Sequence, residues 1–455
     1  MDPDESKVGR WSWKYQIVKI LVRIVFYLFY RRIYVTGREN VPDGGGLIFV
    51  ANHQNALMDA LAVIFTSNYQ PVYLARADLF RNPLIARILL FLKIMPVYRF
   101  RDGVDSMGRN EDTFEKTSAI LSGGGCIGIM PEGNHGDEKR LRILKKGVFR
   151  IAFKAAEICD GSPDVKIVPV GLDYSNTKRV FEELVVNYGK PLPVSEYLGL
   201  YGLHPQKGIN AMRKDLAESM QSLMIDVRDE SNYGKDKLLL DIGCPLLIKQ
   251  LSGRYSRTIN RFEVCRAFTR SMYEYFEKNP RQADQTRLKS ATFSEMLNKY
   301  EIPPGSIEKH GTYKNFLSVA RRVLCFPPFI AGYFLHIIPY IVIHIALKKL
   351  KDPQFISSFK FGIGFVVIPL NYIFLAVLFF CYLPAVIAAL LLAAVPVTGF
   401  IACRCNSYSQ DFKDIMRFRR ICRYDKDFGG TVYRLRSSII KDLAPVLSLA
   451  EEKLK

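Results

Sequence analysis

A histidine and an aspartate follow a strongly apolar run near the start of the chain. His53 and Asp59 come after the segment Leu47–Ala51, with Gln54 to Met58 between them. A short apolar run predicts a buried strand, and open α/β sheets place their reactive groups where such strands end. A carboxylate near an imidazole can select its tautomer and stabilise its positive charge. We therefore predict that His53 acts as a general base and that Asp59 orients it.

The same pattern occurs again further along the chain. A second apolar segment, 126–130, runs directly into Pro131, Glu132, Gly133, Asn134 and His135. The carboxyl ends of neighbouring parallel strands meet at one edge of a sheet. We therefore expect Glu132, Gly133 and His135 to lie beside His53.

Basic residues accompany both motifs. An apolar segment that begins at 93 ends on Arg99 and Arg101, and a loop before a predicted helix carries Lys145 and Lys146. Guanidinium and ammonium groups bind phosphate oxygens through charge-assisted hydrogen bonds. These four side chains suit a phosphate-bearing substrate.

The order of these segments resembles one enzyme family. The His…Asp pair, the Val-Tyr-Arg of 97–99, the Pro-Glu-Gly of 131–133 and the Val-Pro-Val of 168–170 follow one another along the chain. They are similar to the four blocks of the glycerol-3-phosphate and lysophosphatidate acyltransferases, over roughly residues 38–191. The resemblance implies an α/β acyltransferase domain with a mixed sheet flanked by helices. It also implies acyl transfer from acyl-CoA or acyl carrier protein to glycerol 3-phosphate or 1-acylglycerol 3-phosphate.

The resemblance implies roles for single residues as well. His53 becomes the general base and Asp59 its partner, Arg99 holds the acceptor's phosphate, and the corner at 131–133 binds the acceptor. Pro169 corresponds to the proline of the fourth block. Apart from the acyl donor, no cofactor is implied.

The chain departs from the family pattern in two places. The family usually has one residue fewer between the His and the Asp. On an ideal helix the additional residue would turn the aspartate by about 100°, so the pair meets only if His53 precedes the helix or the first turn is irregular. Asn134 and His135 stand where Thr and Arg are usual. The phosphate contact would then fall to Arg99 or to the candidates Arg101, Lys145 and Lys146.

Acyl transfer from a thioester to an alcohol can also be argued from the residues alone. The hydroxyl must lose its proton as its oxygen attacks, and a histidine with a pKa near ambient pH suits that role. No Gly-x-Ser-x-Gly elbow lies near these segments to supply a serine nucleophile. Cys126 lies inside a predicted strand, where packing is the simpler role.

Composition points to an anionic partner. The 455 residues carry a formal net charge of +20, and 49% of them are hydrophobic. Nucleic acid and an anionic bilayer would both fit such a charge. The apolar tracts favour membrane lipids and not nucleic acid. Nine cysteines without paired spacing indicate a reducing, cytoplasmic setting.

The pattern divides the chain into five predicted regions. They are a membrane-interface helix at 1–32, an α/β acyltransferase domain at 33–203, a helical cytoplasmic segment at 204–322, a membrane region at 323–403 and a basic cytoplasmic tail at 404–455. In the first region, polar residues share one arc at helical spacing, which predicts an amphipathic helix in the headgroup layer. The alternative is a helix packed on the domain's own core. The apolar helix at 79–92 is expected in the core, and contact with acyl chains is the alternative.

Residues 361–403 contain no charge at all. That length is about twice what one helix needs to cross a bilayer, so we expect a transmembrane hairpin that turns near 382–384. The earlier tract 323–347 contains Pro327, Pro328 and Pro339, and we expect it to be re-entrant, with a third span as the alternative. Because short basic loops prefer the cytoplasm, we expect the active domain on that face of the membrane.

Three other functions remain open. The acceptor can be a different lipid. A metal hydrolase would use His53, Asp59, Glu132 and His135 as ligands. A non-catalytic membrane scaffold of the same fold is favoured if the longer spacing keeps His53 and Asp59 apart. The oligomeric state is left open.

Overall fold

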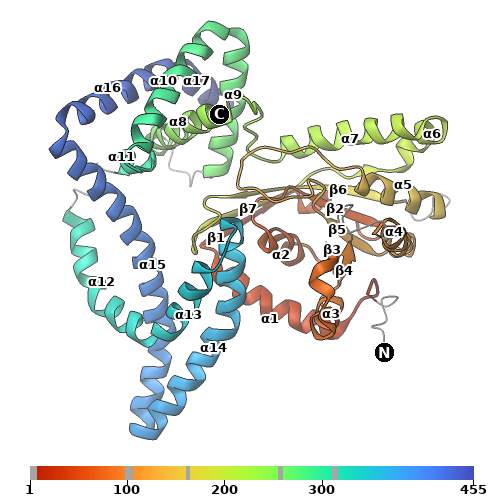
Figure 1. Cartoon of the computed structure of the whole chain (residues 1–455), viewed down its shortest axis with the longest axis horizontal. Coiled ribbons are helices and arrows are strands. Elements are labelled where there is room, and N and C mark those ends of the chain that lie inside the picture. The colour runs from red at the N-terminus through yellow and green to blue at the C-terminus, as the bar shows by residue number, and fades with distance from the viewer. Residues whose placement is uncertain (1–7, 98–105, 160–163, 255–259, 310–315) are drawn as a thin grey trace. The chain divides into compact units, whose positions relative to one another are not determined.

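The structure is a computed structural model that describes residues 8–97, 106–159, 164–254, 260–309 and 316–455 (Figure 1). The chain forms two compact units. The first comprises residues 1–224 and 350–361, and the second comprises residues 225–349 and 362–455. The first unit takes in helix α7 (Pro205–Ser222), which the sequence analysis assigns to the segment 204–322.

The first unit is built on an eight-stranded mixed sheet. Its strands are β1 (Arg32–Thr36), β2 (Leu47–Ala51), β3 (Val72–Arg76), β4 (Ile94–Val97), β5 (Cys126–Ile129), β6 (Lys166–Tyr174), β7 (Glu183–Tyr188) and β8 (Leu192–Pro193). The order is β1-β7-β6-β2-β5-β3-β4, and β8 pairs with β6. The neighbours of β2 are both parallel to it, whereas β7 and β8 run antiparallel to β6. The predicted mixed α/β sheet is confirmed.

Helices cover both faces of this sheet (Figure 1). Alternate residues of β2 point into two separate cores: Ile48 and Val50 into one, Leu47 and Phe49 into the other. This alternation is the two-residue period of a strand. Because both faces are buried, the strand reads as one continuous apolar run. The helices of the unit are α1 (Trp13–Phe29), α2 (Leu57–Thr66), α3 (Pro83–Phe91), α4 (Ser106–Ser122), α5 (Gly147–Cys159), α6 (Ser195–Leu203) and α7.

Two helices of this unit differ from the expectations. The apolar helix α3 is largely exposed, and Leu90 is its one buried residue, so its predicted place in the core is wrong. On α1, part of the polar arc faces the domain. Lys19 is 5% exposed, and its ammonium group donates to the carbonyl oxygens of Ser67 and Tyr69. Buried carbonyls can compensate for the loss of water around this cation.

The second unit is helical over its described residues. Its elements are α8 (Tyr233–Arg254), α9 (Arg261–Lys278), α10 (Pro280–Asn298), α11 (Gly305–Lys309), α12 (Phe316–Leu335), α13 (Ile337–Lys348), most of α14 (Ile356–Tyr382), α15 (Ala385–Tyr424), α16 (Lys426–Asp442) and α17 (Ala444–Glu452). Asp236 is fully buried and receives two 2.8 Å hydrogen bonds from Arg287, which joins α8 to α10.

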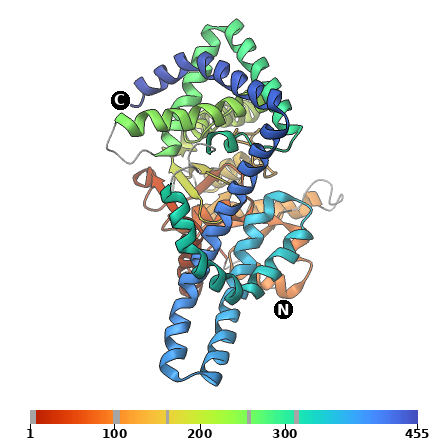
Figure 2. The ribbon, with the colours of Figure 1, turned by 90° about the vertical axis from the view of Figure 1, so that its left-hand side faces the viewer.

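Two helical segments are long and apolar enough to cross a membrane: Pro353–Tyr382 and Ala385–Tyr424. They form the predicted hairpin, which turns at Leu383 and Pro384 (Figure 2). The earlier tract is a bent pair, in which Phe326–Leu335 and Ile337–Lys348 meet at 71°. At the bend, the His336 ring lies 2.9 Å from the carbonyl oxygen of Gly332 and 3.2 Å from the Tyr372 hydroxyl. The bend is compatible with a re-entrant loop and with a broken third span.

Candidate active site

The strands β2 and β5 are parallel neighbours, and their carboxyl ends bring the two polar motifs to one edge of the sheet. Asn52 follows β2 directly and is completely buried. Its side chain donates to the carbonyl oxygen of Leu172 at 3.0 Å and accepts from the Leu172 amide at 2.7 Å. This two-way contact fastens the end of β2 to β6, so the position of His53 is tied to the sheet.

His53 and Asp59 are in direct contact. Nδ1 of His53 lies 2.8 Å from Oδ2 of Asp59, whose side chain is fully buried. The same carboxylate accepts from the Asn55 amide at 2.7 Å and from the Tyr174 hydroxyl at 2.7 Å. Asp59 also lies in the first turn of α2, where the helix dipole favours a negative charge. With Nδ1 turned to the carboxylate, Nε2 is the nitrogen available to accept a proton.

The turn between the two residues explains how the longer spacing is accommodated. His53 precedes helix α2, which begins at Leu57. Ala56 is the N-cap residue of that helix, with φ +45° and ψ −122°, and a positive φ is rare for residues with a Cβ atom. This irregular turn brings Asp59 back under the imidazole. A non-catalytic scaffold would be favoured if His53 and Asp59 stayed apart. They are in contact, so that condition is not met.

Glu132 is held by an arginine that sequence reasoning did not select. Nε of Arg142 donates to Oε2 of Glu132 at 2.6 Å, and its NH2 atom donates to the carbonyl oxygen of His53 at 2.7 Å. The Gly136 amide donates to that same carbonyl at 3.0 Å. Arg142 therefore links the two motifs. In the sequence, the only indication of a role for Arg142 is that it lies in the basic loop between Glu132 and the helix that begins at Gly147.

Oε1 of Glu132 is buried and has no hydrogen-bond partner among the described residues. Burial raises the pKa of this carboxyl above its ordinary value, and Arg142 opposes the shift. A buried acceptor without a donor is costly, and a substrate hydroxyl would satisfy it. Burial, helped by the charge of Asp59, raises the pKa of Tyr174 well above its ordinary value, so this phenol remains a donor.

His135 lies next to His53, with 5.4 Å between the ring centroids. Its Nδ1 contacts the side-chain oxygen of Gln354, and its ring meets Phe355 edge-on at 4.6 Å. Both partners belong to the 3-10 helix η6 (Pro353–Phe355), which is part of the first unit. A segment 219 residues further along the chain therefore contacts His135.

The remaining predicted residues have different positions. Gly133 adopts φ +77°, and the site of its missing Cβ lies 3.6 Å from the side chain of Lys145. Lys145 and Lys146 are exposed, and Lys146 donates to Gln206 at 3.0 Å. Arg99 and Arg101 lie outside the described residues.

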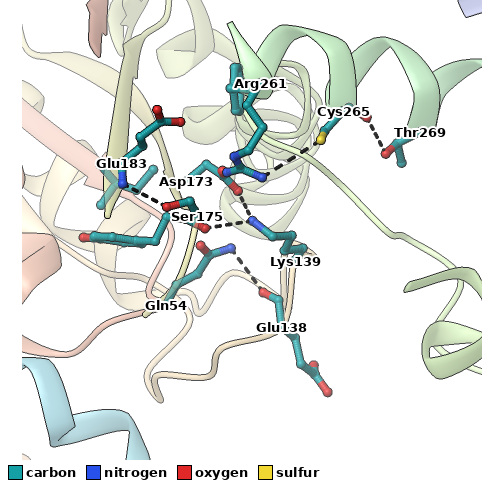
Figure 3. A network of polar contacts seen from close by, with 12 residues as sticks. Gln54, Glu138, Lys139, Asp173, Ser175, Glu183, Arg261, Cys265 and Thr269 are labelled. Carbon is teal, nitrogen blue, oxygen red and sulfur yellow. Dashed lines mark hydrogen bonds and ion pairs between the residues drawn. The ribbon is translucent and has the colours of Figure 1, made fainter. Parts of the chain in front are cut away.

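A buried ion pair fixes the loop between Glu132 and α5 (Figure 3). The ammonium group of Lys139 contacts the carboxylate of Asp173 and lies 3.2 Å from the carbonyl oxygen of Tyr174. Gln54 donates to the carbonyl oxygen of Glu138 at 3.2 Å. The loop that carries Arg142 is thus anchored both to β6 and to the turn after β2.

The His53, Asp59, Glu132 and His135 side chains do not form a metal-binding cluster. Within the described parts of the chain, no group of three or more His, Cys, Asp or Glu side chains is arranged to hold a metal ion.

Comparisons with known proteins find acyltransferases. Residues 32–173 match the family model described as Acyltransferase, a range that runs from β1 through most of β6 and includes His53, Asp59 and Glu132. The chain is 25% identical to the 1-acyl-sn-glycerol-3-phosphate acyltransferase of Borreliella burgdorferi, over 46% of this chain and 80% of that protein. It is 26% identical to glycerol-3-phosphate O-acyltransferase 1 of Saccharomyces cerevisiae, over 63% of this chain and 39% of that protein.

A solved structure is also similar. The 1-acyl-sn-glycerophosphate acyltransferase of Thermotoga maritima aligns over 53% of this chain and 83% of its own, at 18% identity and a TM-score of 0.34. The family match over residues 32–173 confirms the resemblance noted in the sequence. Residues 32–173 are the part of this chain that is similar to the acyltransferase family.

Proposed function

We propose that this chain transfers a fatty acyl group from acyl-CoA or acyl carrier protein to a hydroxyl of glycerol 3-phosphate or 1-acylglycerol 3-phosphate. The observation that carries the proposal is the buried Asp59 carboxylate 2.8 Å from His53 at the edge of the sheet. The names of the bacterial and yeast relatives support a glycerolipid acceptor.

In the proposed reaction, Nε2 of His53 removes the proton from the acceptor hydroxyl as the oxygen attacks the thioester carbonyl carbon. A tetrahedral intermediate forms and collapses with loss of the thiolate. The thiolate then takes the proton from the imidazolium, so the products are an ester and a free thiol. Asp59 stabilises the imidazolium through Nδ1, as in other His–carboxylate pairs.

The acceptor would be held by the groups beside His53. Oε1 of Glu132 is free to accept a hydrogen bond from the second hydroxyl of the glycerol backbone. Lys145 is exposed beside Gly133, so its ammonium group is accessible to the phosphate of the acceptor. Arg99 and Arg101 are further phosphate-binding candidates.

The experiment is an acyl-transfer assay on the full chain in liposomes. Labelled acyl-CoA and acyl carrier protein are each offered against glycerol 3-phosphate and lysophosphatidate. We expect product from the wild type and a loss of about 10²–10⁴-fold in His53→Ala, the range for removal of a general base. The matched control is His204→Ala, which removes an exposed imidazole that makes no capping hydrogen bond at the start of α7.

The outcomes separate the parts of the proposal. Product formation that survives in His53→Ala would remove His53 as the base. No product from folded wild-type protein with any of the four donor and acceptor pairs would overturn the proposed acceptors.

A different lipid acceptor is the second candidate, because His135 and Phe355 contact each other at the corner where the related sequences usually have Thr and Arg. Other lysophospholipids in the same assay test it.

We also propose that the catalytic unit faces the cytoplasm. The support is the charge on the short segments next to the apolar tracts: Lys348, Lys349 and Lys351 before the hairpin and Arg404 near its end. In sealed cells, a membrane-impermeant thiol reagent should leave a cysteine introduced at Lys214 unlabelled until the membrane is opened. Labelling in intact cells would reverse the orientation.

A further inference from the structure

Helix α1 has one face buried against the unit and one face exposed. Its inner face carries the buried Lys19, and the residues just before and within its first turn bond to Gln70. That side chain accepts from the Ser12 amide at 3.0 Å and donates to Gln16 at 3.0 Å. Tyr15, Phe26 and Phe29 complete the buried face. The polar groups on this side are already satisfied by the protein.

The outer face of α1 is apolar. Six of its large side chains are between 49% and 67% exposed: Trp13, Ile17, Ile20, Leu21, Ile24 and Leu28. Trp11, just before the helix, is 69% exposed. Exposed large side chains at this spacing form one continuous stripe. A stripe of this size on a soluble monomer marks a contact surface.

Helix α3 has the same character. Leu84, Ile85, Ile88 and Phe91 are each at least 44% exposed, and Leu79 in the preceding turn is 50% exposed. The helix is capped by Asn82, whose side chain accepts from the amides of Leu84 and Ile85. It is therefore a well-formed apolar helix whose apolar side chains are mostly left uncovered by the first unit.

The two helices are fastened to each other at their ends. Lys93, directly after α3, donates to the carbonyl oxygens of Val8 at 2.9 Å and Arg10 at 2.5 Å, just before α1. Its ammonium group also lies 5.6 Å from the centre of the Tyr15 ring. Figure 1 shows α1 and α3 next to each other on this side of the unit. The two helices with exposed apolar faces are therefore neighbours in the unit.

The charges on this surface indicate what covers it. Neither α1 nor α3 contains an Asp or Glu residue, whereas Lys14, Arg23 and Arg87 lie on them. Aliphatic side chains, tryptophans and cations together are the composition of helices that lie at a lipid–water interface. Docking of a second copy through the same face would bring cations against cations, which is unfavourable.

We propose that the outer faces of α1 and α3 together form a surface of the catalytic unit that inserts into the headgroup and upper acyl region of an anionic bilayer. The unit then contacts the membrane directly, in addition to the hairpin of α14 and α15. This inference does not depend on the identity of the acyl acceptor.

The two tryptophans of the chain, Trp11 and Trp13, both belong to this surface and allow a direct test. The full chain is reconstituted in phosphatidylcholine–phosphatidylglycerol vesicles with lipids brominated along the acyl chain. We expect blue-shifted emission that the bromines quench. To test α3, Ile88→Trp is made in a Trp11→Phe, Trp13→Phe background, with Lys214→Trp on α7 as the exposed control.

We expect lipid quenching of Ile88→Trp at least threefold stronger than that of Lys214→Trp, and protection of Ile88→Trp from aqueous acrylamide. Equal quenching of the two variants by acrylamide, with none by brominated lipid, would overturn the role of α3. Protection from acrylamide without lipid quenching would overturn it too and indicate a protein–protein contact. The fluorescence does not require activity, so failure of the proposed acyl transfer would leave this test intact.

Discussion

The Tyr174 hydroxyl donates a 2.7 Å hydrogen bond to Oδ1 of Asp59, the carboxylate whose other oxygen contacts His53. Tyr174 is the last residue of β6, and Asp59 lies in the first turn of α2. The orientation of the imidazole thus depends on a strand far away in the sequence. Four predictions follow from the groups around this pair.

The first concerns the phenol itself. Tyr174→Phe keeps the ring and removes the donor, which leaves one oxygen of a buried carboxylate unpaired. We expect kcat/KM to fall about tenfold and stability to fall by ~1–3 kcal/mol, the cost of an unsatisfied buried acceptor. Tyr188→Phe is the matched control, because Tyr188 is equally buried and bonds to Thr66 instead. If both variants kept full activity, Tyr174 would have no part in orienting the pair.

The second prediction concerns the charge on Asp59. Asp59→Asn has nearly the same shape but cannot accept from the Asn55 amide, Tyr174 and His53 with the same strength. It also removes the anion that stabilises the imidazolium. We expect a loss of at least about a hundredfold in kcat with little change in KM for the acceptor. A change confined to KM would show that Asp59 acts in acceptor binding.

The third prediction concerns pH. Burial raises the folded-state pKa of Glu132 above its ordinary value of 4.5. Its protonated form is therefore favoured by folding, and the stability it contributes is complete below pH 4.5 and is lost as the pH rises through the raised pKa. The melting temperatures of wild type and Glu132→Gln, measured from pH 4 to pH 8, should reveal this. We expect the wild type to lose stability relative to the variant as the pH rises, and a constant difference would contradict the assigned direction.

The fourth prediction concerns the turn at Ala56. With φ +45°, this residue occupies a conformation that costs of order 1–3 kcal/mol for a non-glycine residue. Ala56→Gly relieves the strain, so we expect unchanged activity and equal or higher thermal stability. Ala56→Val should lower both, because a β-branched side chain increases the strain and the site is buried. Equal melting temperatures for the two variants would show that the turn is not strained.

Local features of the chain were enough to predict most of the architecture. The apolar runs Leu47–Ala51 and 126–130 became the parallel strands β2 and β5, with His53 and Glu132 just after their carboxyl ends. The uncharged tract 361–403 predicted the hairpin, because a sequence of that length without charge has few other stable environments. Strands and apolar helices of this kind depend mainly on residues that are close in the sequence, so the sequence pattern predicts them.

What the tertiary structure decided depends on contacts between distant segments. Tyr174 reaches Asp59, Arg142 reaches the carbonyl of His53, and Gln354 reaches His135, and no local pattern specifies any of these pairs. The same holds for the faces of α1 and α3. A periodic pattern shows that a helix has two different faces, but which face is buried depends on what packs against it. For Lys19, the carbonyls of Ser67 and Tyr69 decide the matter, because they satisfy a cation that would otherwise remain in water.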